Sequence, residues 1–286
     1  MRRFLPVLSV LLALVLVWYG AAVKLNAQWE YDQAARAGAA APEFGQLVAL
    51  TMAQKSPVLP APHQVVVGLW QGLTGQAITS KRSLVYHAWV TLSGTLAGFG
   101  IGTGLGVLLA AAIVHNRAMD MSVMPWAIAS QMVPIVALAP MLAVVMNALG
   151  ASGAMTKAVI SAYLSFFPVV VGMVKGLRSP EVSQLDLLTT YAANKAQVFW
   201  KLRLPASMPY FFASLKVGIA AALVGAIVAE LNQPVGLGAR LLQGSYYSQT
   251  VQIWAALFVA ASMAAVLVAL MARVETRVLL RMGMSR

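Results

Sequence analysis

The chain has 286 residues, of which 60% are hydrophobic and only 10% are charged. Soluble domains carry roughly a quarter charged residues, so this composition excludes a water-soluble globule, and the high apolar content excludes a disordered chain. The 20 Lys and Arg residues outnumber the 8 Asp and Glu residues, but the basic residues lie at the ends of apolar segments, so we expect no nucleic-acid partner. The absence of Cys from the sequence excludes disulfides and thiolate metal sites. The sequence therefore predicts an integral membrane protein.

Charge-free apolar segments divide the chain, and a membrane helix needs about 20 such residues. The first runs from Phe4 to Val23. Its length favours a retained helix, because the apolar core of a cleaved signal peptide spans about 7–15 residues. Trp18 and Tyr19, near its end, are typical of a membrane interface. A signal peptide beginning with the charged pair Arg2 and Arg3 is the alternative.

Residues 24–82 form the next segment, and we expect an external loop there. Within it, Gln64–Leu73 is a short helix candidate with Val66, Leu69 and Trp70 on one face. Such a face favours either a helix lying flat on the membrane surface or a helix packed within the loop.

The second span, Ser83–Asn116, has glycines four residues apart that form one strip along a helix. A strip of this kind allows a neighbouring helix backbone to approach closely. Neither G-x-G-x-x-G nor G-x-x-x-x-G-K-[ST] occurs in the sequence, so we expect helix packing here and no ATP bound by this chain. The predicted packing positions are Gly94, Gly98, Gly102 and Gly106.

The third and fourth spans, within Met121–Thr156 and Ala158–Val174, contain prolines and polar residues. A proline frees a carbonyl and can kink a helix, and in a membrane neighbouring groups must satisfy that carbonyl. Kinked helices lining a substrate pathway and ordinary packing both agree with this pattern. The candidate pathway or gating residues here are Gln131, Pro134, Pro140, Asn147 and Pro168.

The fifth span covers Phe211–Ala229, since Lys216 near one end can extend its charge to the interface. The sixth lies within Val251–Ala272. Glu230 follows the fifth span, and we expect it at the outer interface, with a role either in packing or in substrate gating. The predicted fold class is thus an all-α membrane protein with about six transmembrane helices.

The basic residues predict the orientation, because Lys and Arg concentrate in short cytoplasmic loops. With six spans, most of them fall on the side that carries the chain ends, so both termini should be cytoplasmic. The expected organisation is a first helix at 1–23, an external loop at 24–82, a core with five further helices at 83–280 and a cytoplasmic tail at 281–286.

Residues 175–210 connect the fourth and fifth spans on the predicted cytoplasmic side. Leu185, Leu188, Val198 and Phe199 recur at roughly helical spacing, which indicates a helical hairpin with a small core of its own. Such a hairpin would present a surface to a cytoplasmic partner. The alternative is a helix lying on lipid headgroups.

The stretch from residue 186 to residue 205 resembles the EAA loop of the inner-membrane permeases of ABC importers. The family pattern is Glu-Ala-Ala, three residues, Gly, and a distal hydrophobic-x-Leu-Pro. Counted back from Leu204-Pro205, residues 186–188 replace Glu-Ala-Ala, and Ala192 replaces Gly. Ala is harmless there if its backbone stays in the right-handed region, and we expect this. The predicted coupling residues are Asp186, Leu187, Leu188, Ala192, Ala193, Lys195, Phe199, Leu204 and Pro205.

The resemblance covers roughly residues 57–280. The segments Pro134–Pro140, Phe166–Pro168 and Gly225–Glu230 look like the nitrate, sulfonate and taurine branch of these permeases. The amino-acid sequence of Tyr191–Pro205 also resembles the corresponding segment of permeases that serve pyrimidine or thiamine precursors.

This resemblance implies the ABC transmembrane type-1 architecture in a bacterial inner membrane. A second permease, identical or related, would complete the substrate pathway. A periplasmic solute-binding protein would deliver the solute, and a cytoplasmic ABC ATPase dimer, which holds the ATP, would dock on residues 175–210 as the coupling loop.

An ion-coupled secondary transporter is the alternative function. It would usually place ionisable groups near the membrane midplane and show inverted repeats, and the sequence shows neither pattern. Catalytic motifs and metal-ligating clusters are also missing from the sequence, so we expect neither an enzyme nor a metal site.

Overall fold

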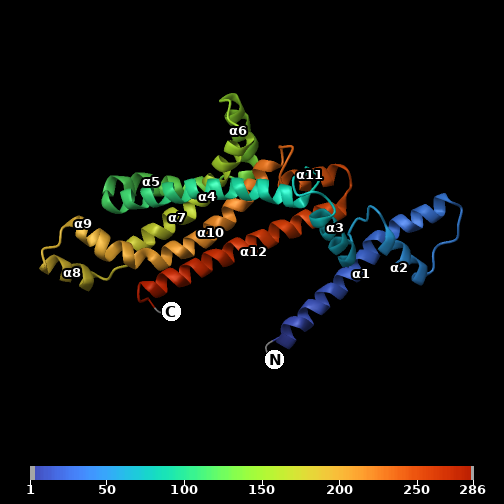
Figure 1. Ribbon diagram of the computed structural model, residues 1–286, viewed down its shortest axis with the longest axis horizontal. Helices are drawn as coiled ribbons and strands as arrows, with labels where there is room; N and C mark the ends of the chain where they lie inside the picture. The colour runs from blue at the N-terminus through green and yellow to red at the C-terminus, as the bar shows by residue number, and fades with distance from the viewer. Residues whose placement is uncertain (1–3, 285–286) are drawn as a thin grey trace. The chain divides into compact units, whose positions relative to one another are not determined.

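The computed structural model describes residues 4–284 (Figure 1). Within that range every regular element is a helix and no strand occurs, which confirms the predicted all-α fold class. The chain divides into two compact units, one from residues 1–87 and 239–260 and the other from residues 88–238 and 261–286. Helices α4 (Leu84–His115) and α12 (Thr250–Arg281) contribute to both units.

Besides these contributions, the first unit contains α1 (Phe4–Arg36), α2 (Phe44–Ala53), α3 (Pro62–Thr74) and most of α11 (Leu237–Tyr246). Helix α1 continues well beyond Val23, where the sequence placed its end. Residues 24–36 have no Pro or Gly that would end the helix, and the buried Asn26 binds a neighbouring segment from inside it. Its side chain donates to the carbonyl of Leu59 at 2.8 Å and accepts from the backbone N–H of Val58 at 2.7 Å.

An aromatic cluster joins α1 to the start of α12 within this unit. The ring centroids of Trp18 and Trp254 lie 4.9 Å apart, and Phe258 stacks on Trp18 at 6.2 Å. The indole N–H of Trp18 donates to the carbonyl of Pro60 at 3.0 Å. Trp18 therefore packs inside the unit through both its ring and its polar atom.

The second unit is built on two antiparallel neighbours, α7 and α10, whose facing side chains form its core. Its helices are α5 (Arg117–Ser130), α6 (Ile135–Ala148), α7 (Gly153–Leu177), α8 (Val182–Thr190), α9 (Lys195–Val198), the π-helical turn η1 (Phe199–Arg203) and α10 (Leu204–Glu230). Fully buried apolar residues between the two helices include Ile160, Val169, Val170, Ile219, Ala222 and Ala226.

Among the described residues, five helices are long and apolar enough to cross a membrane. They are Leu5–Arg36, Leu84–His115, Gly153–Leu177, Lys195–Glu230 and Thr250–Arg281. Helices α5 and α6 are long and apolar enough to cross a membrane only when they are taken together as one bent span. The described residues therefore contain up to six spans. Only 6% of the most apolar stretch of α1 is buried. The apolar side chains of this helix are therefore free to contact lipid or another subunit.

The predicted third span is not one straight helix, because α5 and α6 meet at a bend of 102°. The break falls between Ser130 and Ile135, and Pro134 lies at the start of α6. A proline has no N–H to donate, and it disfavours helical geometry at the preceding residue. Pro134 therefore separates two helices instead of kinking one.

A proline such as Pro205 between the predicted coupling loop and the fifth span would be expected to end the loop helix, but the helix runs from Lys195 to Glu230 without interruption. The turn before Pro205 is π-helical, with the N–H of Leu204 bonded to the carbonyl of Phe199, five residues back. Such a turn moves the carbonyls out of the usual four-residue register. This register accommodates a ring that lacks an N–H and would clash with a carbonyl four residues back.

Lys216 has an ion-pair partner that the sequence did not predict. Its ammonium group lies 2.8 Å from a carboxylate oxygen of Glu275 in α12, and the Glu275 side chain is only 7% exposed. The lysine thus pairs with a neighbouring helix in the second unit, and its extension to the membrane interface stays a prediction.

Candidate functional site

Within the predicted coupling loop, residues 175–210, the part formed by α8, α9 and the turn between them has no buried residue. The prediction of a hairpin with its own buried core was therefore wrong: Leu185, Leu188 and Val198 are only half-buried, and Phe199 packs against the core of the second unit instead. Other apolar side chains of the loop are exposed. Val182, Leu187 and Tyr191 are 72%, 58% and 77% exposed.

Side-chain caps order the loop in place of a core. Gln184 accepts from the N–H of Glu181 at 3.2 Å, at the start of α8. Asn194 and Gln197 cap α9 reciprocally, at 2.8 and 2.9 Å. Caps of this kind satisfy the free N–H groups of a first helical turn, so the loop keeps its shape without burying apolar surface.

The turn between α8 and α9 places Ala192 in the left-handed region, at φ 51°. The right-handed turn expected from the sequence is therefore wrong. The N–H of Ala192 bonds to the carbonyl of Thr189 at 2.9 Å, and that of Ala193 to Leu188 at 3.0 Å. This pair of bonds forms a Schellman motif, which usually has Gly at the left-handed position.

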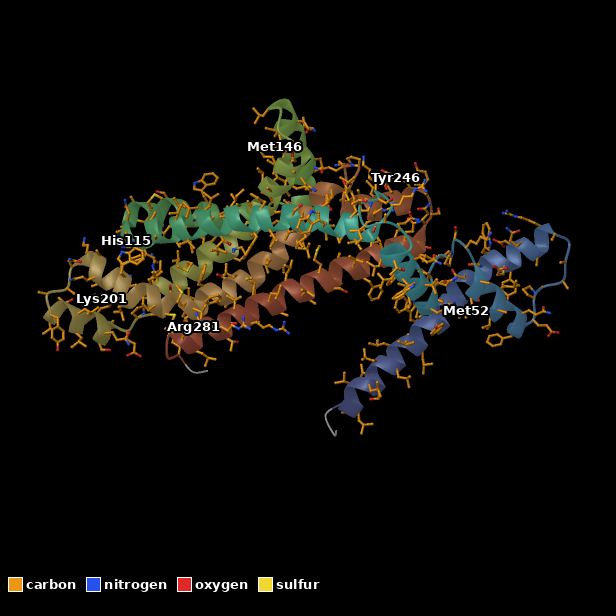
Figure 2. The ribbon with its side chains drawn as sticks, viewed as in Figure 1. Met52, His115, Met146, Lys201, Tyr246 and Arg281 are labelled. Carbon is orange, nitrogen blue, oxygen red and sulfur yellow. The ribbon has the colours of Figure 1, made fainter. Side chains whose placement is uncertain are left out.

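The end of the loop is anchored on the second unit by Phe199. Its ring lies 5.0 Å from that of His115, at the end of α4, and packs against the α7–α10 core. The guanidinium of Arg203 donates to the carbonyl of Leu177 at 3.3 Å. His115 and Lys201 of η1 accordingly lie at the same end of the unit (Figure 2).

The remaining predicted coupling residues divide by exposure. Asp186 and Lys195 are exposed, as are Leu187 and Ala192, so all four are available to a partner. The half-buried members are Leu188, Ala193, Phe199, Leu204 and Pro205.

The glycine strip of α4 faces α7. A Cβ atom on Gly94 would lie 3.2 Å from Lys157, and one on Gly106 would lie 2.8 Å from Val169. At Gly98 and Gly102 an added Cβ would overlap Ser161 and Ser165 and the α7 backbone. At Gly98, Gly102 and Gly106 an added side chain would force α4 and α7 apart, whereas at Gly94 a small shift of the Lys157 side chain would make room.

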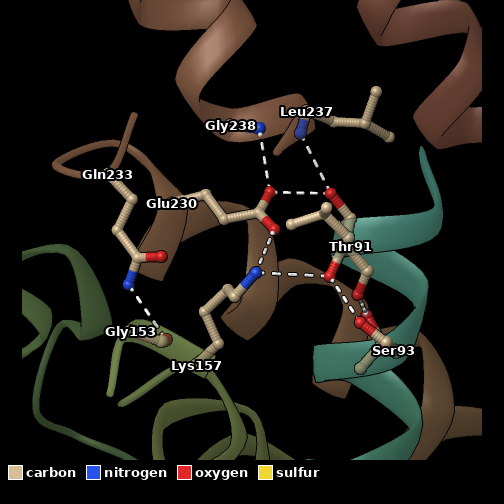
Figure 3. Close-up of polar contacts among 10 residues, drawn as sticks. Thr91, Ser93, Gly153, Lys157, Glu230, Gln233, Leu237 and Gly238 are labelled. Carbon is tan, nitrogen blue, oxygen red and sulfur yellow. Dashed lines mark hydrogen bonds and ion pairs between the residues drawn. The ribbon is translucent and has the colours of Figure 1, made fainter. Parts of the chain in front are cut away.

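A buried polar cluster joins α4, α7 and α10 within the second unit (Figure 3). Glu230 is 0% exposed, and one carboxylate oxygen lies 3.3 Å from the ammonium group of Lys157, which is 4% exposed. The other oxygen accepts from the hydroxyl of Thr91 at 2.7 Å and from the N–H of Gly238 at 3.2 Å. Lys157 also donates to the carbonyl of Val90 at 3.3 Å.

The same cluster holds the segment that follows α10. The N–H of Leu237 donates to the hydroxyl of Thr91 at 2.9 Å. Gly236 has φ 120°, and a Cβ there would overlap the carboxylate of Glu230. Glu230 is therefore enclosed by Lys157, by backbone and by a glycine that leaves room for it.

This arrangement bears on two expectations from the sequence. Glu230 is fully buried by its neighbours in the second unit, which agrees with the packing role expected for it, while its place at the outer membrane interface stays a prediction. The predicted third and fourth spans end at Thr156 and begin at Ala158, which left Lys157 in a loop between them, whereas it lies in the second turn of α7. The sequence did offer one signal for a buried Lys157, because it is a single charge between two apolar stretches. Lys216 has the same kind of surroundings in the fifth span.

The other pathway candidates lie apart from this cluster. Pro134 and Gln131 flank the α5–α6 break, and Asn147 and Pro140 lie on α6; all four are exposed. Pro168 is half-buried inside α7. The structure thus brings Glu230 together with Lys157 and Thr91, not with Gln131 or Asn147.

Residues 102–283 match the family described as "Binding-protein-dependent transport system inner membrane component". This match covers more than half of the chain, and the chain belongs to that family. It is a multi-pass inner-membrane permease subunit of the type I ABC importer class, and a transport subunit, not an enzyme.

Named relatives of the chain are permeases for different solutes. It is 31% identical to the formylaminopyrimidine transport permease protein ThiX of Halalkalibacterium halodurans, over 63% of this chain and 68% of the relative. It is 30% identical to the riboflavin transport system permease protein RibX of Chloroflexus aurantiacus, over 64% and 65% of the two chains. Identity to the putative aliphatic sulfonates transport permease protein SsuC of Bacillus subtilis is 23%, over 71% and 70%.

Proposed function

We propose that the chain lines the pathway of an ATP-driven importer and that its coupling loop, residues 175–210, docks on a separate cytoplasmic ATPase. The observation that carries the proposal is the outward apolar surface of α8 and its turn, formed by Val182, Leu187 and Tyr191. Ordered, exposed apolar side chains rimmed by polar groups are typical of protein interaction sites. Membership of a binding-protein-dependent family supports the same partner.

The assembly that we propose has this loop and both chain termini on the cytoplasmic side. The loop carries Lys195, Lys201 and Arg203, which agrees with the tendency of short cytoplasmic loops to be basic. A second permease, identical or related, would complete the pathway, and a periplasmic binding protein would deliver the solute. Closure of the ATPase dimer would then favour one of two permease conformations over the other.

For the solute we propose a small molecule, either nitrate-, sulfonate- or taurine-like or related to a pyrimidine or thiamine precursor. The named relatives support both groups, since they include a formylaminopyrimidine and an aliphatic sulfonate permease. Relatives this similar serving such different solutes indicate that the separate binding protein supplies much of the selectivity.

The docking proposal is tested by replacing Ala192 with Glu and purifying the tagged chain from its host in mild detergent. The wild-type chain should recover an ATPase subunit, and Ala192→Glu should lose it, because a charge would enter the apolar surface. Ala40→Glu, at an exposed site in the predicted external loop, is the matched control and should retain the ATPase. Equal recovery from both variants would contradict docking at the α8–α9 turn.

The buried Lys157–Glu230 pair is the observation that favours an ion-coupled secondary transporter as the second candidate. Uptake into vesicles distinguishes the two functions. If the chain belongs to an ATP-driven importer, uptake should require ATP and should not change when a proton gradient is imposed. Uptake by the purified chain alone, driven by the gradient, would instead establish the secondary transporter.

A further inference from the structure

The first unit contains a pocket of about 590 Å³ that the proposed function does not use. It lies between α3, the residues before α4, and the adjoining parts of α11 and α12. Helix α3 approaches α12 closely, because a Cβ on Gly68 would lie 2.5 Å from a methyl group of Val251. Pockets of about 300–1,000 Å³ are typical of small-molecule sites.

The charge of the lining is entirely positive. Lys55, Arg82 and Arg240 contribute cationic side chains, and none of the lining residues is acidic. Within the part of the chain that the structure describes, no carboxylate lies within ion-pair distance of these three groups. Three uncompensated cations around one cavity create a potential that attracts anions.

Four amide side chains complete the polar lining. They are Gln71, Gln76, Gln249 and Gln252. An amide offers both donors and an acceptor, so these residues suit the neutral polar groups of a ligand whose charge the cations neutralise.

Arg240 shows that this site has unused hydrogen-bonding capacity. One of its terminal nitrogens donates to the backbone carbonyl of Arg82 at 2.8 Å, which fixes the guanidinium in place. Its Nε is buried and has no hydrogen-bond partner among the described residues. Burial lowers the pKa of Arg240 from its ordinary value, because the charged form loses solvation. A buried donor without a partner is costly, and an anion would relieve that cost.

We propose that this pocket binds a small solute through an anionic group, a carboxylate, sulfonate or phosphate, held by Arg240, Arg82 and Lys55. Guanidinium groups suit such planar or tetrahedral oxyanions because they donate in a fork. The inference needs no ATPase partner, so a failed docking experiment leaves it intact.

The test uses the full chain in nanodiscs of phosphatidylcholine alone, titrated calorimetrically with methanesulfonate and with inorganic phosphate at low ionic strength. At least one probe should bind saturably. Arg82→Gln and Arg240→Gln should each weaken binding by about tenfold or more, since each removes a charge-assisted hydrogen bond. Arg82 holds Arg240 through its backbone oxygen, so Arg82→Gln removes the charge and keeps that structural bond.

The matched control is Arg36→Gln, which removes an exposed arginine of the same unit outside the pocket. It should leave the dissociation constant unchanged, and Arg240→Lys should retain part of the affinity. Absence of saturable binding, or an equal loss in Arg36→Gln, would overturn the proposal.

A lipid headgroup carries the same anionic chemistry, and nanodiscs containing phosphatidylglycerol separate the two sources. If the pocket takes a solute, phosphatidylglycerol leaves the affinity for the probe unchanged. If the lipid blocks the probe, and Arg240→Gln abolishes enrichment of phosphatidylglycerol around the chain, the solute proposal is wrong and the site belongs to lipid.

Discussion

Ala192 adopts a left-handed backbone conformation in the turn between α8 and α9. For a residue with a Cβ this region costs about 1–2 kcal/mol, while the Schellman bonds to Thr189 and Leu188 hold it there. The turn is therefore a strained point in an otherwise well-capped loop.

Ala192→Gly should stabilise the turn by up to about 1 kcal/mol, since Gly adopts positive φ without a steric penalty. The measurement is hydrogen exchange of the amides of residues 189–193, which should become slower. Ala196→Gly in α9 is the control with the opposite sign, because Gly in helical geometry costs about 1 kcal/mol. Faster exchange in Ala192→Gly would contradict the strain.

Glu230 and Lys157 stabilise the second unit only as a pair. Glu230→Gln leaves a buried ammonium group without its carboxylate, and breaking a buried pair costs about 3–5 kcal/mol. We expect a marked drop in Tm, measured by intrinsic fluorescence in detergent. Lys157→Met combined with Glu230→Gln should recover much of the loss, because no charge then remains buried.

The exposed ion pair between Asp120 and Arg178 provides the comparison for this result. Its side chains are 34% and 45% exposed, with 2.9 Å between the charged atoms. Surface pairs contribute about 0–1 kcal/mol, so Asp120→Asn should barely move Tm. If Asp120→Asn lowered Tm as much as Glu230→Gln does, the burial of an ion pair would not be what determines its contribution to stability.

At the scale of elements, helix α4 contains two glycines, Gly98 and Gly100, that lie on different faces of the helix. An added Cβ at Gly98 overlaps α7, whereas Gly100 has nothing within 4 Å. Gly98→Ala should lower Tm, while Gly100→Ala should leave it unchanged or raise it, because Ala favours a helix by about 1 kcal/mol. Thermal unfolding of the two variants measures this directly. Equal shifts would mean that α4 does not pack on α7 through this strip.

The sequence predicted elements well where one periodic pattern decided them. The helices around Ile160 and Ile219 were expected because their apolar runs are long and the second contains only one charge, Lys216. The bend at Pro134 was not, because a proline can either kink a helix or separate two, and the choice depends on neighbouring helices. The contact of Asn26, in the part of α1 past Val23, with Leu59 was not expected either, because it is a tertiary contact that no local pattern encodes.

The site was predictable to a similar degree. The loop around Ala192 was located by its resemblance to a motif, but its backbone conformation was not, since Ala usually favours a right-handed turn. Glu230 stood out as an acidic residue next to a span. Its partner Lys157 was missed because one charge between two apolar runs also marks a loop, and only packing distinguishes the two cases.

At the scale of the whole molecule, the proposed orientation of the chain in the membrane can be tested by thiol labelling. The sequence has no Cys, so a single introduced Cys is the only thiol that can react. A single thiol at Ser183, in α8, should react with a membrane-impermeant maleimide only in inside-out vesicles. A single thiol at Thr79, before α4, should react only from the outside of intact cells. Both residues are exposed, so access to the reagent depends on the side of the membrane. The reversed pattern would invert the orientation and place α8 away from any cytoplasmic ATPase.

The uninterrupted helix from Lys195 to Glu230 has a mechanical consequence. At about 1.5 Å per residue, its 36 residues form a rod that reaches from the exposed loop to the buried carboxylate. Had Pro205 ended the helix, a joint would lie between these two ends and would absorb any movement of the loop. The π turn keeps the helix continuous across Pro205. If the loop docks on an ATPase as proposed, a tilt at Lys195 would therefore reach Glu230 through one helix, and the ion pair between Glu230 and Lys157 would resist that tilt.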